Sequence, residues 1–396
     1  MTALPYRLEL QGLRAVAVLA VMIFHLNPAW MPGGFIGVDV FFVISGFLIV
    51  SILLRKKTEP KYQLSSTLRS FYTSRLKRIA PAYFFMLVLV SLAAAGLFLS
   101  PDLGIYRKSL RAATWFNSNS YFATFGDYFA PANHEQPLLH TWSLAIEIQF
   151  YLLAPFFVLL LPIKTLRWIF SILLVGLTVF AQYRLQAFGL QQATYYSLYA
   201  RLPEFFAGGL VAMHLRTGLI LPPWVSNLGL GLILFAAAAQ PLLGPFPGLP
   251  ALLPVAGAAL ILLTPKAGGV SQQLLANKPT VWLGELSYSL YLWHWPVLAL
   301  LRYYTGSQIL DLPFSLLFIA LTLLLATLSF YCVETPLRAN RIQRQQILGY
   351  GLLVIGIGMT ATSMVAINRA LSPAPLPIEY QRYADPATIC HGQIVG

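Results

Sequence analysis

Arg14 and His25 lie together in the first apolar run of the chain, at 10–30. The run is otherwise almost continuously hydrophobic and is about long enough for a helix that crosses a lipid bilayer. At about 100° per residue, the spacing places both side chains on one helix face, about 16 Å apart along the axis. A charged side chain in mid-bilayer costs about 2.5 to 3.5 kcal/mol and usually faces a protein interior, where it serves a pathway or a reaction. The spacing therefore predicts a cation near one membrane surface and an imidazole near the other.

Ionisable side chains also occur in later apolar runs. Asp39 follows the glycines of GGFIGVDVFF, and a carboxylate at membrane depth needs a partner. We interpret Asp39 either as the partner of a basic group or as a residue with a direct functional role. His140 and Glu147, in HTWSLAIEIQFY, are nearly two turns apart and share one side of a helix. Arg201 and Glu204 are three residues apart, which predicts an ion pair within one helix.

Two further motifs carry groups suited to ligand binding and acid–base chemistry. SRLKRIAP places Arg75 and Arg78 on one face of the approach to the third apolar run. Arginine forks suit phosphate, so the pair is interpreted as a dock for an anionic cytosolic donor, or else as a topology signal that contacts lipid headgroups. LGELSYSLYLWHWP contributes Tyr291 and His294. An interfacial aromatic belt would explain the tryptophans of this motif, but it does not explain the histidine between them.

The composition indicates what kind of molecule positions these residues. Of the 396 residues, 58% are hydrophobic and only 10% are charged, a balance outside the range of ordinary soluble domains. Apolar runs near spanning length predict about eleven transmembrane helices. These runs lie at 10–30, 34–54, 80–99, 139–161, 167–186, 198–215, 225–242, 249–264, 281–301, 312–333 and 347–367. The expected fold class is an all-α polytopic membrane protein.

The net charge of +13 indicates orientation more than a binding partner. Eight of the 26 Lys and Arg residues lie between the second and third apolar runs, and short positive loops stay on the cytoplasmic side. We therefore expect a cytoplasmic N-terminus and, with an odd number of helices, an extracytoplasmic C-terminus. Because most of the charge is explained in this way, nucleic acid is not an expected partner. The first apolar run lacks the features of a cleaved signal peptide and is expected to stay as a helix.

The motifs, taken in order, resemble the membrane acyltransferase family 3. The resemblance is carried by QGLRAVAVLAVMIFH, GGFIGVDVFFVISGF, SRLKRIAP, HTWSLAIEIQFY, RLPEFFAGG, LGELSYSLYLWHWP and VETPLR, and it covers about residues 6–340. It implies a bacterial inner-membrane O-acyltransferase. Such an enzyme takes an acyl group, commonly acetyl, from cytosolic acyl-CoA and places it on a glycan outside, such as O-antigen or another cell-surface polysaccharide.

The resemblance also implies a domain organisation. Residues 1–340 would form a bundle of about ten helices, and 341–367 would hold an additional transmembrane helix. The Pro-spaced stretch SPAPLPIEYQRY favours an extended extracytoplasmic linker, and 368–396 would lead toward an SGNH-like domain.

Roles for individual residues follow from the resemblance. Arg14 and His25 match the arginine and histidine of the family's first helix, and Arg75 with Arg78 match its cytoplasmic arginine pair. Acyl transfer to a hydroxyl needs a base, and a neutral imidazole suits this task, so His25 is expected to be the base or a transient acyl carrier. Arg14, Arg75 and Arg78 are expected to bind acetyl-CoA, the acyl donor.

Other candidates complete the expected site, which includes no metal. The expected catalytic set is His25, Arg14, Asp39 and Glu147, and the candidates on the acceptor side are His140, His294 and Tyr291. Relatives often carry a second acidic residue after Glu147, whereas this chain has Ile148, which weakens any scheme with paired carboxylates there. Direct transfer and a relay through an acyl-enzyme both stay open.

Two functions from other classes compete with this interpretation. A transporter or flippase could use the intramembrane charges as a substrate path. Its hallmark would be related halves with matched broken helices, which the sequence does not show. The chain could also be a catalytically silent anchor for an outer domain.

Overall fold

The structure, a computed structural model, describes residues 7–124, 134–218, 221–264 and 269–338, and single residues between 349 and 370. Helices dominate these ranges, and no strand occurs in them. The helices are α1 (Leu8–Leu26), η1 (Gly34–Ile36), α2 (Gly37–Lys57), α3 (Leu64–Leu97), α4 (Ser100–Thr114), α5 (Ser118–Ala123), α6 (Thr141–Leu160), α7 (Ile163–Phe188), α8 (Gln191–Tyr195), α9 (Leu198–Leu215), α10 (Trp224–Ala239), η3 (Gln240–Leu242), η4 (Leu249–Ala251), α11 (Leu252–Leu262), α12 (Val270–Ala276), α13 (Lys278–Thr305), α14 (Leu312–Leu328), η5 (Ser329–Glu334) and α15 (Thr335–Arg338).

Six of the described helical segments are each long and apolar enough to cross a membrane. They are Leu8–Leu26, Gly34–Lys57, Leu64–Leu97, Thr141–Leu160, Ile163–Phe188 and Leu312–Arg338. On α7, the large apolar residues Trp168, Ile172, Val175 and Val179 are all exposed. They recur every three or four positions, so they form one continuous apolar face of the kind that contacts lipid. The predicted fold class, an all-α polytopic membrane protein, is confirmed.

The other helices predicted before residue 334 also occur, with α10 and α11 shorter than a typical span. Helices α10 and α11 pack against each other, and the Gly- and Pro-rich stretch 244–250 separates them. The predicted helix at 347–367 and the tail to 396 lie mostly outside the described residues. The division of the chain near residue 340 therefore stays a prediction.

Helix α3 begins much earlier than predicted, at Leu64 instead of residue 80. Hydropathy marks only the apolar part of a helix, whereas 64–80 contains no Gly or Pro that would end one. The polar start of α3 is held against the neighbouring helix, because the Tyr72 hydroxyl donates to the carbonyl oxygen of Leu152 at 3.0 Å. Arg75 and Arg78 consequently lie inside a long regular helix and point from it into the bundle.

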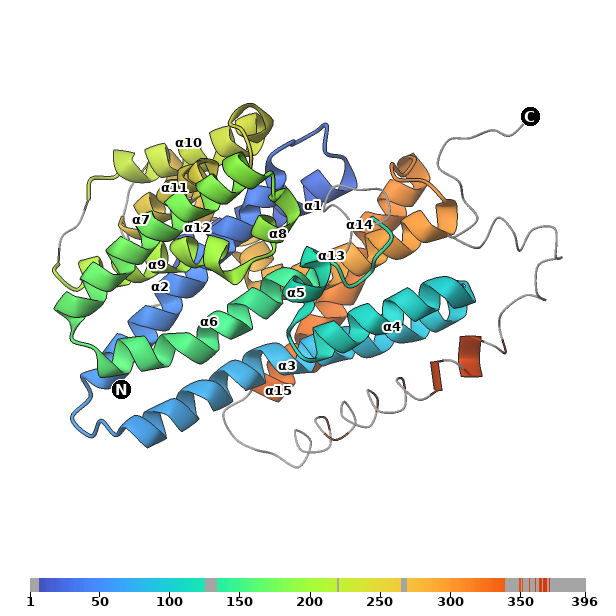
Figure 1. Cartoon of the computed structure of the whole chain (residues 1–396), viewed down its shortest axis with the longest axis horizontal. Helices are drawn as coiled ribbons and strands as arrows, with labels where there is room; N and C mark the ends of the chain where they lie inside the picture. Colours follow the sequence, from blue (N-terminus) through green and yellow to red (C-terminus); the bar gives the residue numbers. More distant parts are fainter. Residues whose placement is uncertain are drawn as a thin grey trace.

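The segment 100–138, which lies between two of the predicted transmembrane runs, contains the helices α4 and α5. α4 lies alongside α3 in Figure 1. The Tyr106 hydroxyl lies 2.8 Å from Ser91 Oγ, and the Tyr83 hydroxyl donates to the carbonyl oxygen of Ala113 at 2.9 Å. These bonds join the two helices in an antiparallel arrangement. The sequence-based interpretation missed α4 because its single buried face gives no long apolar run.

Helix α1 occupies the middle of the bundle. It packs most extensively on α13 and also on α2 (Figure 1). A Cβ at Gly284 of α13 would lie 1.9 Å from the carbonyl oxygen of Gln11, and a Cβ at Gly37 would lie 2.2 Å from that of Ala17. Only glycine allows backbones to come this close. The two glycines therefore set the distance of α1, with Arg14 and His25, from the helices on either side.

Candidate active site

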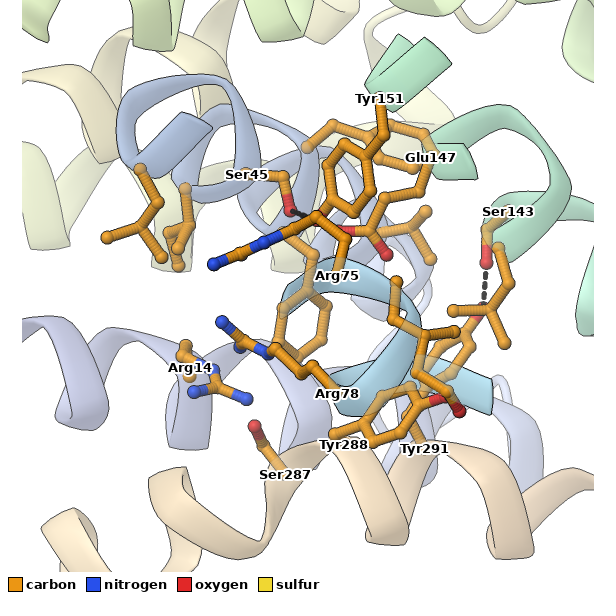
Figure 2. Close-up of a pocket in the computed structure, with 17 residues that line it drawn as sticks. Arg14, Ser45, Arg75, Arg78, Ser143, Glu147, Tyr151, Ser287, Tyr288 and Tyr291 are labelled. Atoms are coloured by element: carbon orange, nitrogen blue, oxygen red, sulfur yellow. Dashed lines mark hydrogen bonds between the residues drawn. The ribbon is translucent and has the colours of Figure 1, made fainter. Parts of the chain in front are cut away.

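A cavity lined by three arginines opens between α1, α2, α3, α6 and α13. Its volume is about 70 Å³, and we call it the arginine cavity because Arg14, Arg75 and Arg78 line it. In Figure 2 their guanidinium groups lie toward one side of the cavity, and Ser143 lies on the other. The structure thus brings together the three arginines that the sequence predicts as donor-binding residues, from two helices that are far apart in the chain.

Glu147 also lines this cavity and is held by two hydroxyl groups. The Ser45 and Tyr151 hydroxyls both donate to Glu147 Oε1. Arg14 donates from Nη1 to Gln11 Oε1 at 3.2 Å, and Arg75 Nε is buried without a hydrogen-bond partner among the described residues. The cavity lining therefore has three cations and one carboxylate, and this excess of positive charge suits an anionic ligand.

A second, smaller cavity lies beside His25. Its volume is about 10 Å³, roughly the room for one water molecule, and we call it the histidine cavity because His25 and His140 line it. Trp142 and Trp295 are among its other lining residues. Neither ring nitrogen of His140 makes a hydrogen bond of ordinary geometry with the described part of the chain. His140 is 2% exposed, so its ring is a buried polar group that faces a cavity without an ordinary partner.

Val38 and Tyr291 line both cavities and form the partition between them. The Tyr291 hydroxyl lies 2.7 Å from Ser143 Oγ and donates to the carbonyl oxygen of His140 at 3.3 Å. These bonds hold the ring of Tyr291 between α13 and the start of α6 (Figure 2). Arg14 and His25 therefore line two adjoining spaces that share a thin wall, instead of one continuous passage.

His25 makes a direct contact with His294, a residue that the sequence also singles out. His25 Nδ1 lies 3.0 Å from His294 Nε2, and His294 Nδ1 lies 2.7 Å from the carbonyl oxygen of Tyr291. Trp295 packs its ring edge-on against the His25 ring, with 4.5 Å between centroids. Arg302 donates from Nη2 to the backbone carbonyl of His25 at 2.6 Å. The imidazole of His25 is thus fixed by His294 and Trp295, and its backbone is held by Arg302, all three from α13.

Comparison with known proteins agrees with the resemblance that the motifs predict. A family model described as an acyltransferase domain matches residues 7–334. The chain belongs to this acyltransferase family. It is 32% identical over 360 residues to the peptidoglycan O-acetyltransferase OatA of Listeria monocytogenes, in an alignment that covers 84% of this chain and 56% of the relative. It is 32% identical over 355 residues to the O-acetyltransferase OatA of Staphylococcus aureus, with 83% and 57% covered.

The chain spans little more than half the length of these curated relatives. No solved structure is significantly similar to it. All residues that line the two cavities lie within the part of the chain that the family model matches.

Asp39 is the one predicted catalytic residue that lines neither cavity of the acyltransferase domain. It lies 2.9 Å from Arg201, which also pairs with Glu204 at 3.3 Å, and all three are buried. The predicted Arg201–Glu204 ion pair is thus present, and Asp39 has the basic partner that one of its two interpretations requires. A direct catalytic role for Asp39 stays a prediction. The guanidinium of Arg201 also lies 5.3 Å from the centroid of Trp142, so this ion cluster supports a wall of the histidine cavity.

Four residues of the site were missed in the sequence: Ser45, Ser143, Tyr151 and Arg302. Tyr151 could have been found, because it follows Glu147 by four residues and so shares its helix face. Ser45 and Ser143 are isolated hydroxyls in apolar helices, where serine is common for packing. Within the described ranges, no group of three or more His, Cys, Asp or Glu residues is placed to hold a metal ion.

Proposed function

We propose that this chain is the membrane part of an O-acyltransferase that moves an acetyl group from acyl-CoA to a hydroxyl of a cell-surface polymer. One observation carries the proposal: in a member of an acyltransferase family, a cationic cavity adjoins a histidine cavity across one thin partition. The charge of the cationic cavity suits the donor, and the imidazoles beside the histidine cavity suit proton transfer from an acceptor hydroxyl. Family membership favours this function over a transporter or a silent anchor.

The donor would enter the arginine cavity. Coenzyme A carries several phosphate groups and a narrow pantetheine arm that ends in the thioester. Arg75 and Arg78 lie nearer the start of α3, which is expected to face the cytoplasm, and they would bind phosphate through charge-assisted hydrogen bonds. Arg14 lies about 16 Å from His25 along α1. One thioester cannot touch both side chains, so Arg14 would hold the arm and leave the acyl end to reach the partition.

The chemistry would take place at the partition. The oxygen of an acceptor hydroxyl attacks the thioester carbonyl carbon, and the carbon–sulfur bond breaks. The hydroxyl proton passes to His25 and then to the thiolate of coenzyme A. The hydroxyls of Tyr291 and Ser143 lie beside this point and could donate hydrogen bonds to the oxyanion. These roles leave direct transfer and an acyl relay through His25 as alternatives for experiment.

Peptidoglycan is the first acceptor to test. The Listeria relative is named for this polymer, although the motifs alone led us to expect O-antigen as one candidate. Both polymers present sugar hydroxyls outside the plasma membrane, so the proposed reaction is the same for either.

The test is mass spectrometry of cell-surface polymers from the natural host, with and without the full-length protein. We expect a mass shift of one acetyl unit on one polymer, and we expect His25→Ala to abolish it at unchanged protein abundance. His214→Ala is the matched control, since His214 lies on α9 and lines neither cavity. Normal acetylation with His25→Ala would exclude His25 as the base.

A further inference from the structure

We propose that His294 is a positioning residue that fixes the tautomer of His25. In this arrangement Nδ1 of His25 carries the proton and Nε2 carries the lone pair. The catalytic consequence rests on the proposed function, because it assumes that His25 is the base. The tautomer itself follows from the hydrogen bonds and does not depend on that function.

The first step concerns the proton on His294. Its Nδ1 lies 2.7 Å from the carbonyl oxygen of Tyr291, one turn earlier in α13. A carbonyl oxygen only accepts hydrogen bonds, so Nδ1 of His294 must carry a hydrogen. A neutral imidazole has one N–H group, so its lone pair then lies on Nε2. The backbone of α13 thereby sets the tautomer of His294.

The second step excludes a charged His294. The residue is 0% exposed, and it takes part in none of the ion pairs of the described residues. A buried charge without a carboxylate partner is costly. A neutral His294 therefore presents an acceptor nitrogen toward His25, and the facing Nδ1 of His25 must be the donor.

The third step concerns the quality of this hydrogen bond. A ring nitrogen lies about 1.1 Å from the centre of a five-membered ring with bonds of about 1.33 Å. The ring centroids of His25 and His294 are 5.2 Å apart, which is the separation expected when both nitrogens lie on the line between the centres at 3.0 Å. The ring planes differ by only 7°. The rings are therefore nearly coplanar and edge to edge, so the lone pair of one nitrogen points along the N–H bond of the other.

The consequence is that the basic nitrogen of neutral His25 is the one on the ring edge away from His294. His25 lines the histidine cavity, whereas His294 is not among its lining residues. Nε2 would therefore face the side proposed for the acceptor hydroxyl. A carboxylate does the same for the base of serine hydrolases, where the wrong tautomer costs most of the activity. Here a second histidine, anchored to a backbone carbonyl, would take that role.

The tautomer can be measured directly by ¹⁵N NMR of the full-length protein labelled at its six histidines. The His25 signals are identified by their loss in His25→Gln. We expect the Nδ1–H tautomer in the unmodified protein and a mixture of tautomers in His294→Leu, which has no acceptor. His294→Gln offers an amide oxygen in place of Nε2 and should restore the Nδ1–H form. His214→Gln should leave the His25 signals unchanged.

Activity gives the second measurement. We expect His294→Leu to lower kcat about 10- to 100-fold with little change in KM for acyl-CoA, and His294→Gln to recover part of the loss. An Nε2–H tautomer in the unmodified protein, or an unchanged tautomer in a folded His294→Leu variant, would overturn the proposal. If His25→Ala keeps its acetylation activity but the tautomer of His25 in the unmodified protein and the His294 variants is as expected, the role of His25 as the base fails and the positioning of His25 by His294 survives. If no polymer loses acetyl groups when the protein is absent, the proposed function itself fails, whatever the tautomer.

Discussion

At the scale of single residues, the proposed donor site rests on the three arginines of the arginine cavity. Each guanidinium that contacts phosphate should contribute about 1.5 to 3 kcal/mol. We therefore expect Arg75→Ala or Arg78→Ala to weaken binding of a non-hydrolysable acetyl-CoA analogue about 10- to 100-fold, measured by calorimetry on the purified full-length protein. Arg167→Ala is the control, because Arg167 bonds to the carbonyl oxygen of Met213 outside the cavity. Unchanged affinity in the cavity variants would show that the donor binds elsewhere.

The partition gives a second prediction for single residues. Tyr291→Phe and Ser143→Ala each remove one hydroxyl of the same hydrogen bond, which is 2.7 Å long. We expect each change to lower kcat about tenfold without changing donor affinity, and the double variant to lose little more than either single one, since coupled residues are not additive. The measurement is a double-mutant cycle on kcat. Fully additive losses would mean that the two hydroxyls act separately.

The sequence predicts which residues belong to the site better than it predicts which of them lie in the same cavity. The helical spacing of Arg14 and His25 correctly places them on the inner side of one helix, because that depends only on helix geometry. Their separation into two cavities depends on Val38 and Tyr291, which reach the same point from α2 and α13. No local pattern indicates which side chains from distant helices will meet there.

At the scale of helices, contacts between α1 and α13 decide where His25 and His294 meet. The would-be Cβ of Gly284 lies 1.9 Å from a backbone oxygen of α1, so Gly284→Ala forces the helices apart. Overpacking of this kind costs about 1 to 3 kcal/mol. We expect a lower Tm in detergent and reduced activity. The same change at Gly176 of α7, where nothing lies within 4 Å of the would-be Cβ, should leave both nearly unchanged. Equal Tm values for the two variants would contradict this account of α1.

The buried cluster of Asp39, Arg201 and Glu204 joins α2 to α9. Substitutions in this cluster can show whether Asp39 serves as an ion-pair partner or has a direct catalytic role. If its role is the ion pair, Asp39→Asn should lower the Tm while the folded protein keeps its activity per molecule within a few-fold. Arg201→Met leaves two buried carboxylates without their cation, which should cost about 3 to 5 kcal/mol. Thermal unfolding and activity of the same samples check this. Loss of activity in a fully stable Asp39→Asn protein would instead favour the catalytic role.

Helix boundaries also show what hydropathy can predict. The predicted range 198–215 agrees with α9 although Arg201 and Glu204 interrupt it, because the two charges satisfy each other inside the bundle. The start of α3 was predicted sixteen residues too late, because its polar first turns are held by contacts outside the apolar core and not by hydrophobicity. Apolar length thus predicts which segments are helices, whereas polar contacts set where the helices end.

At the scale of the whole molecule, the direction of the proposed reaction depends on how the bundle is oriented. The Arg75 and Arg78 side of the arginine cavity must face the cytosol if cytosolic acyl-CoA is to enter it. The basic segment between α2 and α3 predicts this orientation, since short positive loops stay on the cytoplasmic side. The loop between α13 and α14 should then lie outside.

Single-cysteine variants of the full-length protein can test this orientation. Thr58 and Ser307 are both exposed and lie in these two loops, so Thr58→Cys and Ser307→Cys form a matched pair in a background without other cysteines. In intact spheroplasts, a membrane-impermeant maleimide should label Ser307→Cys and not Thr58→Cys, and permeabilisation should make both react. The reverse pattern would place the Arg75 and Arg78 side of the arginine cavity outside the cell. A cytosolic thioester could not reach it there, so this result would rule out the proposed direction of transfer even if the chemistry at His25 were correct.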